Sequence, residues 1–189
     1  MKEQAILQRY FLAIIPPEPI FSEIHQLKVY VKEKYNTKAA LNSPPHITLH
    51  MPFMWKEHKE AILIEKLEAF GQLQTPFEIK LNNFNAFAPR VIYADVVPNN
   101  HLVILQKHLE RFCKINFQLF NANRLDQPFH PHLTLAFRDL KKGIFDLAWQ
   151  EFSNKQYSAT WQVESIFILK HNGSIWEKYK QVGLKKTIH

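Results

Sequence analysis

Two short stretches of the chain carry the residues best suited to chemistry. The sequence reads Pro-His-Ile-Thr-Leu around His46 and Pro-His-Leu-Thr-Leu around His132, a little under half of the chain further on. In a strand, residues i and i+2 share a face, so His46 and Thr48 point to one side while the aliphatic residues point to the other. The same holds for His132 and Thr134. Packing accounts for one such strand, but not for the same polar pair in the same register twice.

Two histidines and two threonines facing each other suit in-line displacement at phosphorus. This reaction needs a base to activate the nucleophile and an acid to protonate the leaving oxygen. Histidine titrates near neutrality, so one ring can be neutral while the other is protonated. Threonine hydroxyls can donate hydrogen bonds to the non-bridging phosphate oxygens. The pattern therefore predicts a catalytic pair, His46 and His132, with Thr48 and Thr134 binding the phosphate, and it requires no metal and no cofactor.

The elements before and after the first motif follow from apolar periodicity. Residues 10–15 form a short apolar run ended by two prolines, which predicts a buried strand. Apolar residues then recur at spacings of three and four over residues 20–31, which predicts a helix. The motif strand itself is expected over residues 46–51. A second helix is expected over residues 57–70.

The second half of the sequence repeats this order around the second motif. Asn99 or Asn100 is expected to cap the helix before the motif, Asp139 to cap the helix after it, and Asn172-Gly173 to form a two-residue hairpin turn. The predicted segments are strands at 77–81 and 91–97 with a bulge at 82–85, a helix at 102–112, a polar loop at 121–128, the motif strand at 131–137, a helix at 140–152, a long strand at 161–169 and a last strand at 175–182.

This repeated order predicts an α+β fold made of a duplicated, bilobal unit. We expect two mostly antiparallel sheets flanked by helices, in a single two-lobed domain over residues 1–189. A pseudo-two-fold axis would relate the lobes, each with one motif, and a central cleft would receive both His/Thr faces.

Composition sets the broad class. The 189 residues are 46% hydrophobic and 22% charged, which is typical of a soluble globular protein. The net charge of +7 favours an anionic partner such as RNA or a phosphorylated small molecule, although the lysines are scattered. The single cysteine, Cys113, excludes an intrachain disulfide and is expected to be a buried, inert thiol. No apolar run is long enough for a membrane span, and the first residues do not resemble a signal peptide, so a cytoplasmic location is expected. We expect no membrane association and no obligate protein partner.

The two His-x-Thr motifs, as PHITL and PHLTL, resemble those of the two-histidine (2H) phosphoesterase superfamily. The similarity is to the branch of 2′-5′ RNA ligases and cyclic phosphodiesterases, and Pro89-Arg90-Val91-Ile92-Tyr93 gives weaker support. The resemblance implies hydrolysis of 2′,3′-cyclic phosphates or related RNA-end phosphodiesters. It also implies that any 2′-5′ ligation is the ATP-independent reversal of cleavage, and the sequence holds no glycine-rich phosphate loop.

One position departs from the pattern of that branch. Bacterial members often continue the second motif as His-x-Thr-Leu-x-Arg, whereas here Phe137 occupies that place and arginine follows as Arg138. Strand parity would put Arg138 on the face of His132 and Thr134, where it could be an additional contact to the substrate.

Two other functions stay open at this level. The motif segments hold four histidines, His46, His50, His130 and His132, whose strand parity would suit a His-rich metal-dependent hydrolase. The basic charge would also suit an RNA-binding module with weak or no catalysis. The sequence does not decide the physiological substrate, a 2′- or 3′-phosphate product, which histidine is the base, or the oligomeric state.

Overall fold

The computed structural model describes residues 6–122 and 128–185, and within them it contains four α-helices and eight strands. In chain order these are β1 (Leu7–Ile14), α1 (Ile20–Tyr35), β2 (Ile47–Lys56), α2 (Glu60–Gly71), β3 (Phe77–Phe87), β4 (Val91–Val96), α3 (Asn100–Phe117), β5 (His132–Ala136), α4 (Lys142–Phe152), β6 (Ser158–Val163), β7 (Ser165–His171) and β8 (Trp176–Gly183). Short 3₁₀ helices lie at Ala39–Asn42 and Glu57–Lys59. The predicted loop at 121–128 lies mostly outside the described residues. No helix in the described part of the chain is long and apolar enough to cross a membrane.

The strands form one eight-stranded sheet in the order β6-β3-β4-β5-β2-β1-β7-β8, and all neighbours are antiparallel. The predicted α+β class with antiparallel strands is confirmed. The two sheets expected from the sequence are the two halves of this single sheet. Their junction is narrow, because β2 and β5 share one Cα pair, Ile47 with Leu133. The two motif strands are therefore central neighbours.

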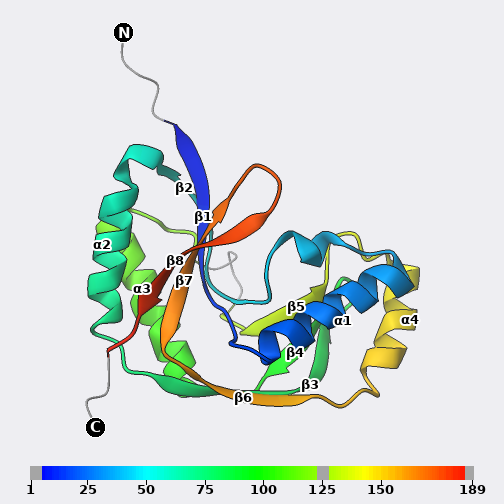
Figure 1. The fold of residues 1–189 in the computed structure, drawn as a ribbon. Coiled ribbons are helices and arrows are strands. Elements are labelled where there is room, and N and C mark those ends of the chain that lie inside the picture. The colour runs from blue at the N-terminus through cyan, green and yellow to red at the C-terminus, as the bar shows by residue number, and fades with distance from the viewer. Residues whose placement is uncertain (1–5, 123–127, 186–189) are drawn as a thin grey trace.

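The halves of the sheet are not the halves of the sequence. One half contains the first two and the last two strands, β1, β2, β7 and β8, and helices α2 and α3 cover it (Figure 1). The other half contains β3 to β6, and α1 and α4 cover it. Helix α1 packs on β5 and α3 packs on β2, so each motif strand is supported by a helix that precedes the other motif strand.

The long strand predicted over residues 161–169 is wrong in one respect. The structure divides it at Glu164 into β6, which pairs with β3, and β7, which pairs with β1. Alternation of apolar residues continues through both pieces, which is why the sequence pattern does not reveal the break. The consequence is a curled sheet, whose two outer regions are joined through this segment (Figure 1).

The two faces of the sheet carry different clusters. Tyr10, Leu12 and Ile14 of β1 belong to the large core, whereas the alternate residues Phe11 and Ala13 belong to a small separate cluster. Ala13 is the strand partner of Thr48. Because paired residues in an antiparallel ladder point to the same side, the motif polar residues lie on the face of the small cluster.

Candidate active site

The register of β2 and β5 brings the two motifs together. Ile47 is opposite Leu133, and both side chains are fully buried. Continuing this antiparallel register by one residue in each direction puts His46 beside Thr134 and Thr48 beside His132, on the face opposite to the Ile47–Leu133 pair. All four polar side chains are partly exposed. The register is thus symmetric about the Ile47–Leu133 pair, as a pseudo-two-fold axis requires.

Both histidines are held in the same way. Nδ1 of His46 lies 2.7 Å from the carbonyl oxygen of Pro44, and Nδ1 of His132 lies 2.7 Å from the carbonyl oxygen of His130. A carbonyl oxygen only accepts, so in each ring Nδ1 carries the proton and donates it to the residue two positions earlier. This fixes the tautomer and leaves Nε2 as the atom that can take or give a proton.

His46 lies in an environment that disfavours its charged form. Its ring contacts Phe11 of β1, with centroids 4.8 Å apart. Burial, followed by the positive charge of Lys28 and a smaller effect of His132, lowers the pKa of His46 to about 3. The bond to the Pro44 carbonyl opposes this shift but does not overcome it. His46 is therefore neutral at physiological pH.

His132 has aromatic and acidic neighbours. Its ring lies 5.1 Å from those of Phe87 and Tyr93, measured between centroids. Burial lowers its pKa, and the bond to the His130 carbonyl opposes this shift. The charge of the His130 ring lowers the pKa further, whereas the carboxylate of Asp95 raises it. Asp95 is the strand partner of His132 on β4, so its carboxylate faces the histidine from the adjacent strand. Tyr93 also bonds the exposed His130, with 3.2 Å between the hydroxyl and Nε2.

The segment before His46 is fixed at both ends of its 3₁₀ helix. The ammonium group of Lys28 donates to the carbonyl oxygens of Ala40 and Ser43, both at 3.0 Å. Asp139, which follows the second motif strand, accepts from the Thr37 hydroxyl and from the backbone N–H groups of residues 38 and 39. The prediction that Asp139 caps a helix at residue 140 is wrong, because α4 begins at Lys142 without a side-chain cap.

Lys28 and Asp95 were not identified from the sequence. Lys28 lies on α1 between Ile24 and Val31, at the spacings of four and three that define the buried stripe. Its side chain is only 2% exposed, and burial lowers its pKa to about 7. A charged residue at an apolar position of a helix was the signal available for Lys28. No comparable signal marks Asp95, whose role depends on strand pairing.

The four motif histidines do not share one face. The pairing of β1 with β2 shifts by one residue between Thr48 and His50, which is a β-bulge at Leu49. His50 is consequently buried beside Phe53 of the large core rather than next to His46. Among the described residues, no group of three or more His, Cys, Asp or Glu is arranged to hold a metal ion.

The parity argument for Arg138 also fails, because β5 ends at Ala136 and alternation does not continue to residue 138. Arg138 has a φ of 59°, is exposed, and places its guanidinium group 5.0 Å from the ring centre of Phe137. Cys113 is buried as predicted, and burial raises the pKa of its thiol to about 12, so it is unreactive near neutrality.

A sequence model of the 2′-5′ RNA ligase superfamily matches residues 16–174, which include both motifs. The chain belongs to this superfamily. Among curated relatives, a protein of Geobacillus kaustophilus with the name "Putative phosphoesterase" is 28% identical over 186 residues, covering 95% of this chain and 99% of the relative. A similarly named protein of Geobacillus thermodenitrificans is 29% identical over 163 residues, covering 83% of this chain and 88% of the relative.

Solved structures agree with this superfamily at the level of the fold. TT0787 of Thermus thermophilus superposes with a TM-score of 0.63 at 19% identity, covering 94% of this chain and 98% of that protein. Escherichia coli LigT in complex with 3′-AMP superposes with the same TM-score and identity, covering 96% of this chain and all of LigT. These likenesses establish the architecture of the superfamily member described here.

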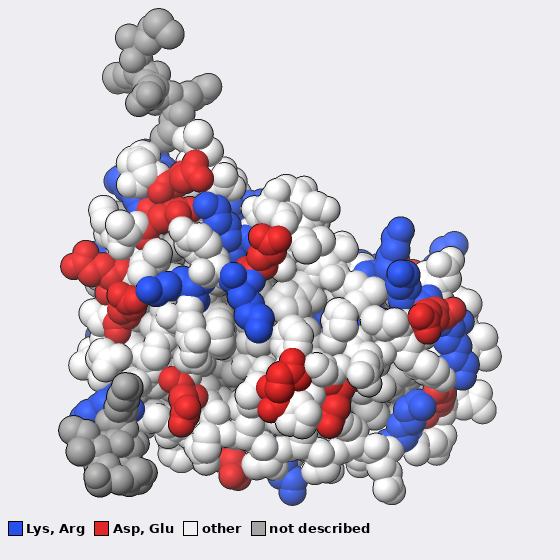
Figure 2. Space-filling view, viewed as in Figure 1, with Lys and Arg blue, Asp and Glu red and all other residues white. Residues whose placement is uncertain are grey.

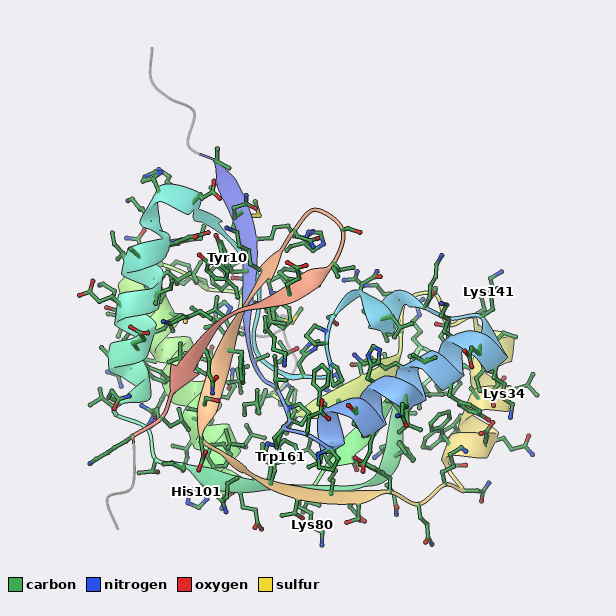
Figure 3. All side chains as sticks on the ribbon, viewed as in Figure 1. Tyr10, Lys34, Lys80, His101, Lys141 and Trp161 are labelled. Carbon is green, nitrogen blue, oxygen red and sulfur yellow. The ribbon has the colours of Figure 1, made fainter. Side chains whose placement is uncertain are left out.

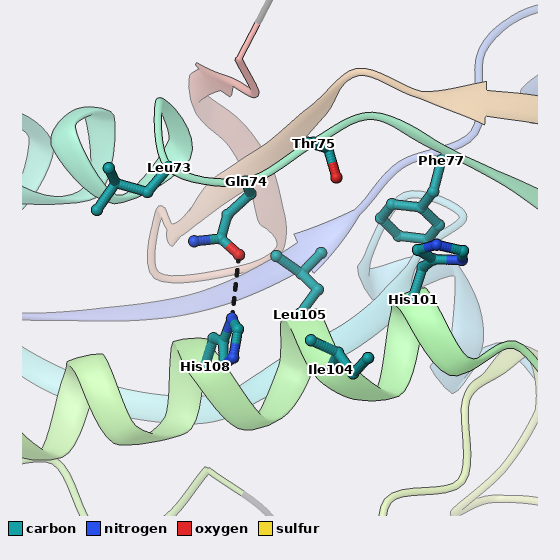
Figure 4. A pocket seen from close by; sticks show the side chains of 8 residues that line it. All are labelled: Leu73, Gln74, Thr75, Phe77, His101, Ile104, Leu105 and His108. Carbon is teal, nitrogen blue, oxygen red and sulfur yellow. Dashed lines mark hydrogen bonds between the residues drawn. The ribbon is translucent and has the colours of Figure 1, made fainter.

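Two small pockets lie away from the motifs of this superfamily member. One, of about 160 Å³, lies between α3 and the segment that leads into β3, and it includes His101 and His108 (Figure 4). His108 lies 3.4 Å from the side-chain oxygen of Gln74, and no motif residue lines this pocket. The other, of about 250 Å³, lies beside the junction of β6 and β7 and includes Glu18 and Glu164.

The charges of the chain are mixed on the face seen in Figure 2. Lysine and arginine side chains alternate there with aspartate and glutamate, and no broad area of one sign is formed. This distribution resembles an ordinary solvated surface more than an extended nucleic-acid interface. On this face, therefore, the basic net charge forms no surface that would favour a module that only binds RNA.

Proposed function

We propose that the protein is a phosphodiesterase that hydrolyses 2′,3′-cyclic phosphates, or related phosphodiesters at RNA ends, by acid–base catalysis with His46 and His132. One observation carries this proposal: both rings donate Nδ1–H to a carbonyl and therefore offer Nε2 as a proton-transfer atom on the same face of adjacent strands. Thr48 and Thr134 alternate with them on that face.

The reaction needs only groups that this chain supplies. One Nε2 removes a proton from water as the water oxygen attacks phosphorus. The Nε2–H of the other ring protonates the ribose oxygen as its bond to phosphorus breaks. The two threonine hydroxyls donate hydrogen bonds to the non-bridging oxygens, where negative charge increases in the transition state. The base and the acid come from different, adjacent strands, so they can stand on two sides of the phosphorus atom, as attack in line with the leaving oxygen needs. The reaction requires no metal.

The substrate class is inferred from the superfamily and from its structures. The superfamily is named after 2′-5′ RNA ligase, and Escherichia coli LigT has been crystallised with 3′-AMP and with ATP. A nucleotide or RNA end carrying a cyclic phosphate or a 2′-5′ linkage fits these names and the anionic partner expected from the net charge. Running the same steps in reverse, with a ribose hydroxyl in place of water, would join two ends without ATP.

The test is hydrolysis of a 2′,3′-cyclic nucleotide, compared with cyclic-phosphate RNA ends and 2′-5′-linked dinucleotides, all in excess EDTA. We expect turnover to survive EDTA and to have a bell-shaped pH dependence. His46→Ala and His132→Ala should each lose roughly 10²–10⁴-fold in rate. The double variant should lose little more, because groups that act as a unit are non-additive.

The matched control is His58→Ala, since His58 is an exposed histidine after β2 and outside both motifs. It should leave the rate unchanged. Activity that EDTA abolishes and zinc restores would favour a metal-dependent hydrolase. RNA binding without hydrolysis of any of the three substrates would favour the RNA-binding module.

A further inference from the structure

We infer that the fold assigns unequal roles to the two histidines, His46 being the general base and His132 the general acid, and that Lys28 is the positioning residue that imposes this difference. The inference rests on the proposed function and goes beyond it, because the two motifs themselves are equivalent. The asymmetry comes from residues outside them.

On the His46 side the added charge is positive. Lys28 extends from α1 to the segment that leads into His46, and its ammonium group is tied to two carbonyl oxygens there, the nearer one in sequence being Ser43. Those carbonyls are neutral acceptors, so within the described residues no hydrogen-bonded carboxylate cancels the charge. A cation placed beside a histidine opposes protonation of the ring. The other titratable group acting on His46 is His132 from β5, and Phe11 from β1 is apolar.

On the His132 side the added charges oppose each other, and one of them is a carboxylate, a group that His46 lacks. Asp95 is the strand partner of His132, and its carboxylate favours the protonated ring. The bond to the His130 carbonyl also favours the protonated ring, whereas the charge of the His130 ring opposes protonation and has a larger effect than Asp95. The His130 ring is exposed to solvent, which screens its charge as salt is added. Tyr93 and Phe87 complete the surroundings of the ring. When two like groups have environments that separate their protonation, the one that loses its proton first is suited to be the base.

Lys28 is charged over the pH range in which it affects His46. Burial lowers the pKa of Lys28 to about 7, so the amine is charged throughout the acidic range in which His46 would otherwise take up a proton. Above neutrality Lys28 loses its charge, but His46 is already neutral there. In each turnover His46 takes one proton from water and His132 gives one to the leaving oxygen. Exchange with solvent then restores both rings.

The first experiment uses two substrates that differ in the leaving group. A 2′,3′-cyclic phosphate needs a proton on its leaving oxygen, whereas a 4-nitrophenyl phosphodiester does not. We expect His132→Ala to be severely impaired on the cyclic phosphate but to regain at least tenfold, relative to wild type, on the nitrophenyl ester. His46→Ala should stay impaired on both. The reverse pattern would overturn the assignment, while near-wild-type rates of both variants on the cyclic phosphate would overturn the proposed function itself.

The second experiment does not depend on turnover. In an NMR titration of the wild-type protein, we expect the ring of His46 to take up its proton at lower pH than the ring of His132. Lys28→Met removes the charge but keeps the length of the side chain, and should raise the titration midpoint of His46 by about one pH unit. The acidic limb of kcat/KM should move to higher pH with it. Loss of a purely structural contact would lower the rate without moving either midpoint.

Lys32→Met is the matched control, because Lys32 lies one turn further along α1 and is exposed. It should leave both titrations unchanged. A midpoint of His46 that does not move in a folded Lys28→Met variant would overturn the role of Lys28. Should that variant fail to fold, the wild-type titration decides, since a His46 midpoint above that of His132 contradicts the assignment.

Discussion

Thr48 and Thr134 each stand two positions after a catalytic candidate, on the same face of the sheet and opposite the histidine of the other motif. A donor held at such a position is most useful when negative charge builds up on a bound phosphate, because it is already oriented. Valine has nearly the shape of threonine but cannot donate. The threonines can therefore be tested with little change in packing.

We expect Thr48→Val and Thr134→Val each to lower turnover by roughly 10²–10³-fold, the effect of removing one oxyanion donor. Hydrolysis of a 2′,3′-cyclic nucleotide, measured with urea unfolding on the same samples, separates this loss from a loss of fold. Thr160→Val is the control, because Thr160 lies exposed on β6. Full activity of either motif variant would show that its hydroxyl does not contact the phosphate.

Lys28 also makes stability depend on pH. Its pKa is about 7 in the folded protein and near 10.5 when the chain is unfolded, so between these values the unfolded chain binds more protons. The free energy of unfolding should therefore rise with pH over this window, by up to about 1.4 kcal/mol per pH unit from this group. Urea unfolding at pH 7 and pH 9 should show the rise in wild type and in Lys32→Met, and a smaller rise in Lys28→Met. Equal slopes in all three proteins would contradict the burial of a titrating amine.

At the scale of elements, helix α2 packs closely against β8 at Gly71. A Cβ added at Gly71 would lie 2.4 Å from the backbone oxygen of Gly183 and 2.9 Å from a methyl carbon of Val182. The backbone oxygen cannot move aside as a flexible side chain can. This close approach explains a glycine in the last turn of the helix, where the sequence indicates only a helix end.

Gly71→Ala should consequently lower the free energy of unfolding by about 1–3 kcal/mol, the usual cost of overpacking. Gly143→Ala is a matched control on α4, since a Cβ there meets nothing within 4 Å. That substitution should be neutral or stabilise by up to about 1 kcal/mol, because alanine is the better helix former. Urea denaturation measures both values, and a stabilising Gly71→Ala would mean that α2 and β8 are further apart.

Periodicity predicted the type and order of the elements, because each strand and helix repeats its apolar positions over several residues. The cap at Asn99 is confirmed, since its side chain accepts from the N–H of Leu102. The hairpin at Asn172 exists, but its loop covers residues 172–175 because β7 and β8 close at the pair His171–Trp176. The bulge at Leu49 and the break at Glu164 depend on pairing with distant strands, and the role of Asp139 depends on contacts with residues 37–39. No local pattern contains these contacts.

In the site, too, local features could be predicted from the sequence and distant contacts could not. The histidines and threonines could be named because strand parity within five residues is local. Lys28 and Asp95 reach their histidines from α1 and β4, elements that the sequence pattern gives no reason to place there. The predicted orientation of Arg138 relied on strand alternation, which does not apply because β5 ends at Ala136.

At the scale of the molecule, we propose that the described chain acts as one two-lobed domain, because its two repeats exchange elements. Helix α1 packs on β5, α3 packs on β2, and β1 pairs with β7. Near the C-terminal end of α1, Lys34 (labelled in Figure 3) and Tyr30 donate hydrogen bonds to the carboxylate of Glu151 on α4. Neither repeat can bury its apolar surface without the other.

A break after Pro98, between β4 and α3, should therefore leave two fragments that do not fold alone. We expect fragments 1–98 and 99–189 each to lack a cooperative thermal transition in circular dichroism, and a mixture of the two to regain it together with hydrolysis. The intact chain is the reference at the same concentration. A cooperative transition in the first fragment alone would show that the repeats are independent.

The pairing of β1 with β7 also bears on how the chain folds during its synthesis. Tyr10 is opposite Lys170, so β1 leaves the ribosome long before β7, the strand that covers its second edge. Helix α1 meets its strand, β5, only after residue 136 has emerged. Contacts this distant along the sequence slow folding, because a long loop must close before they form. Between the synthesis of β1 and α1 and that of their partners, the nascent chain carries unpaired apolar faces, a state in which chaperones that hold such surfaces apart can act.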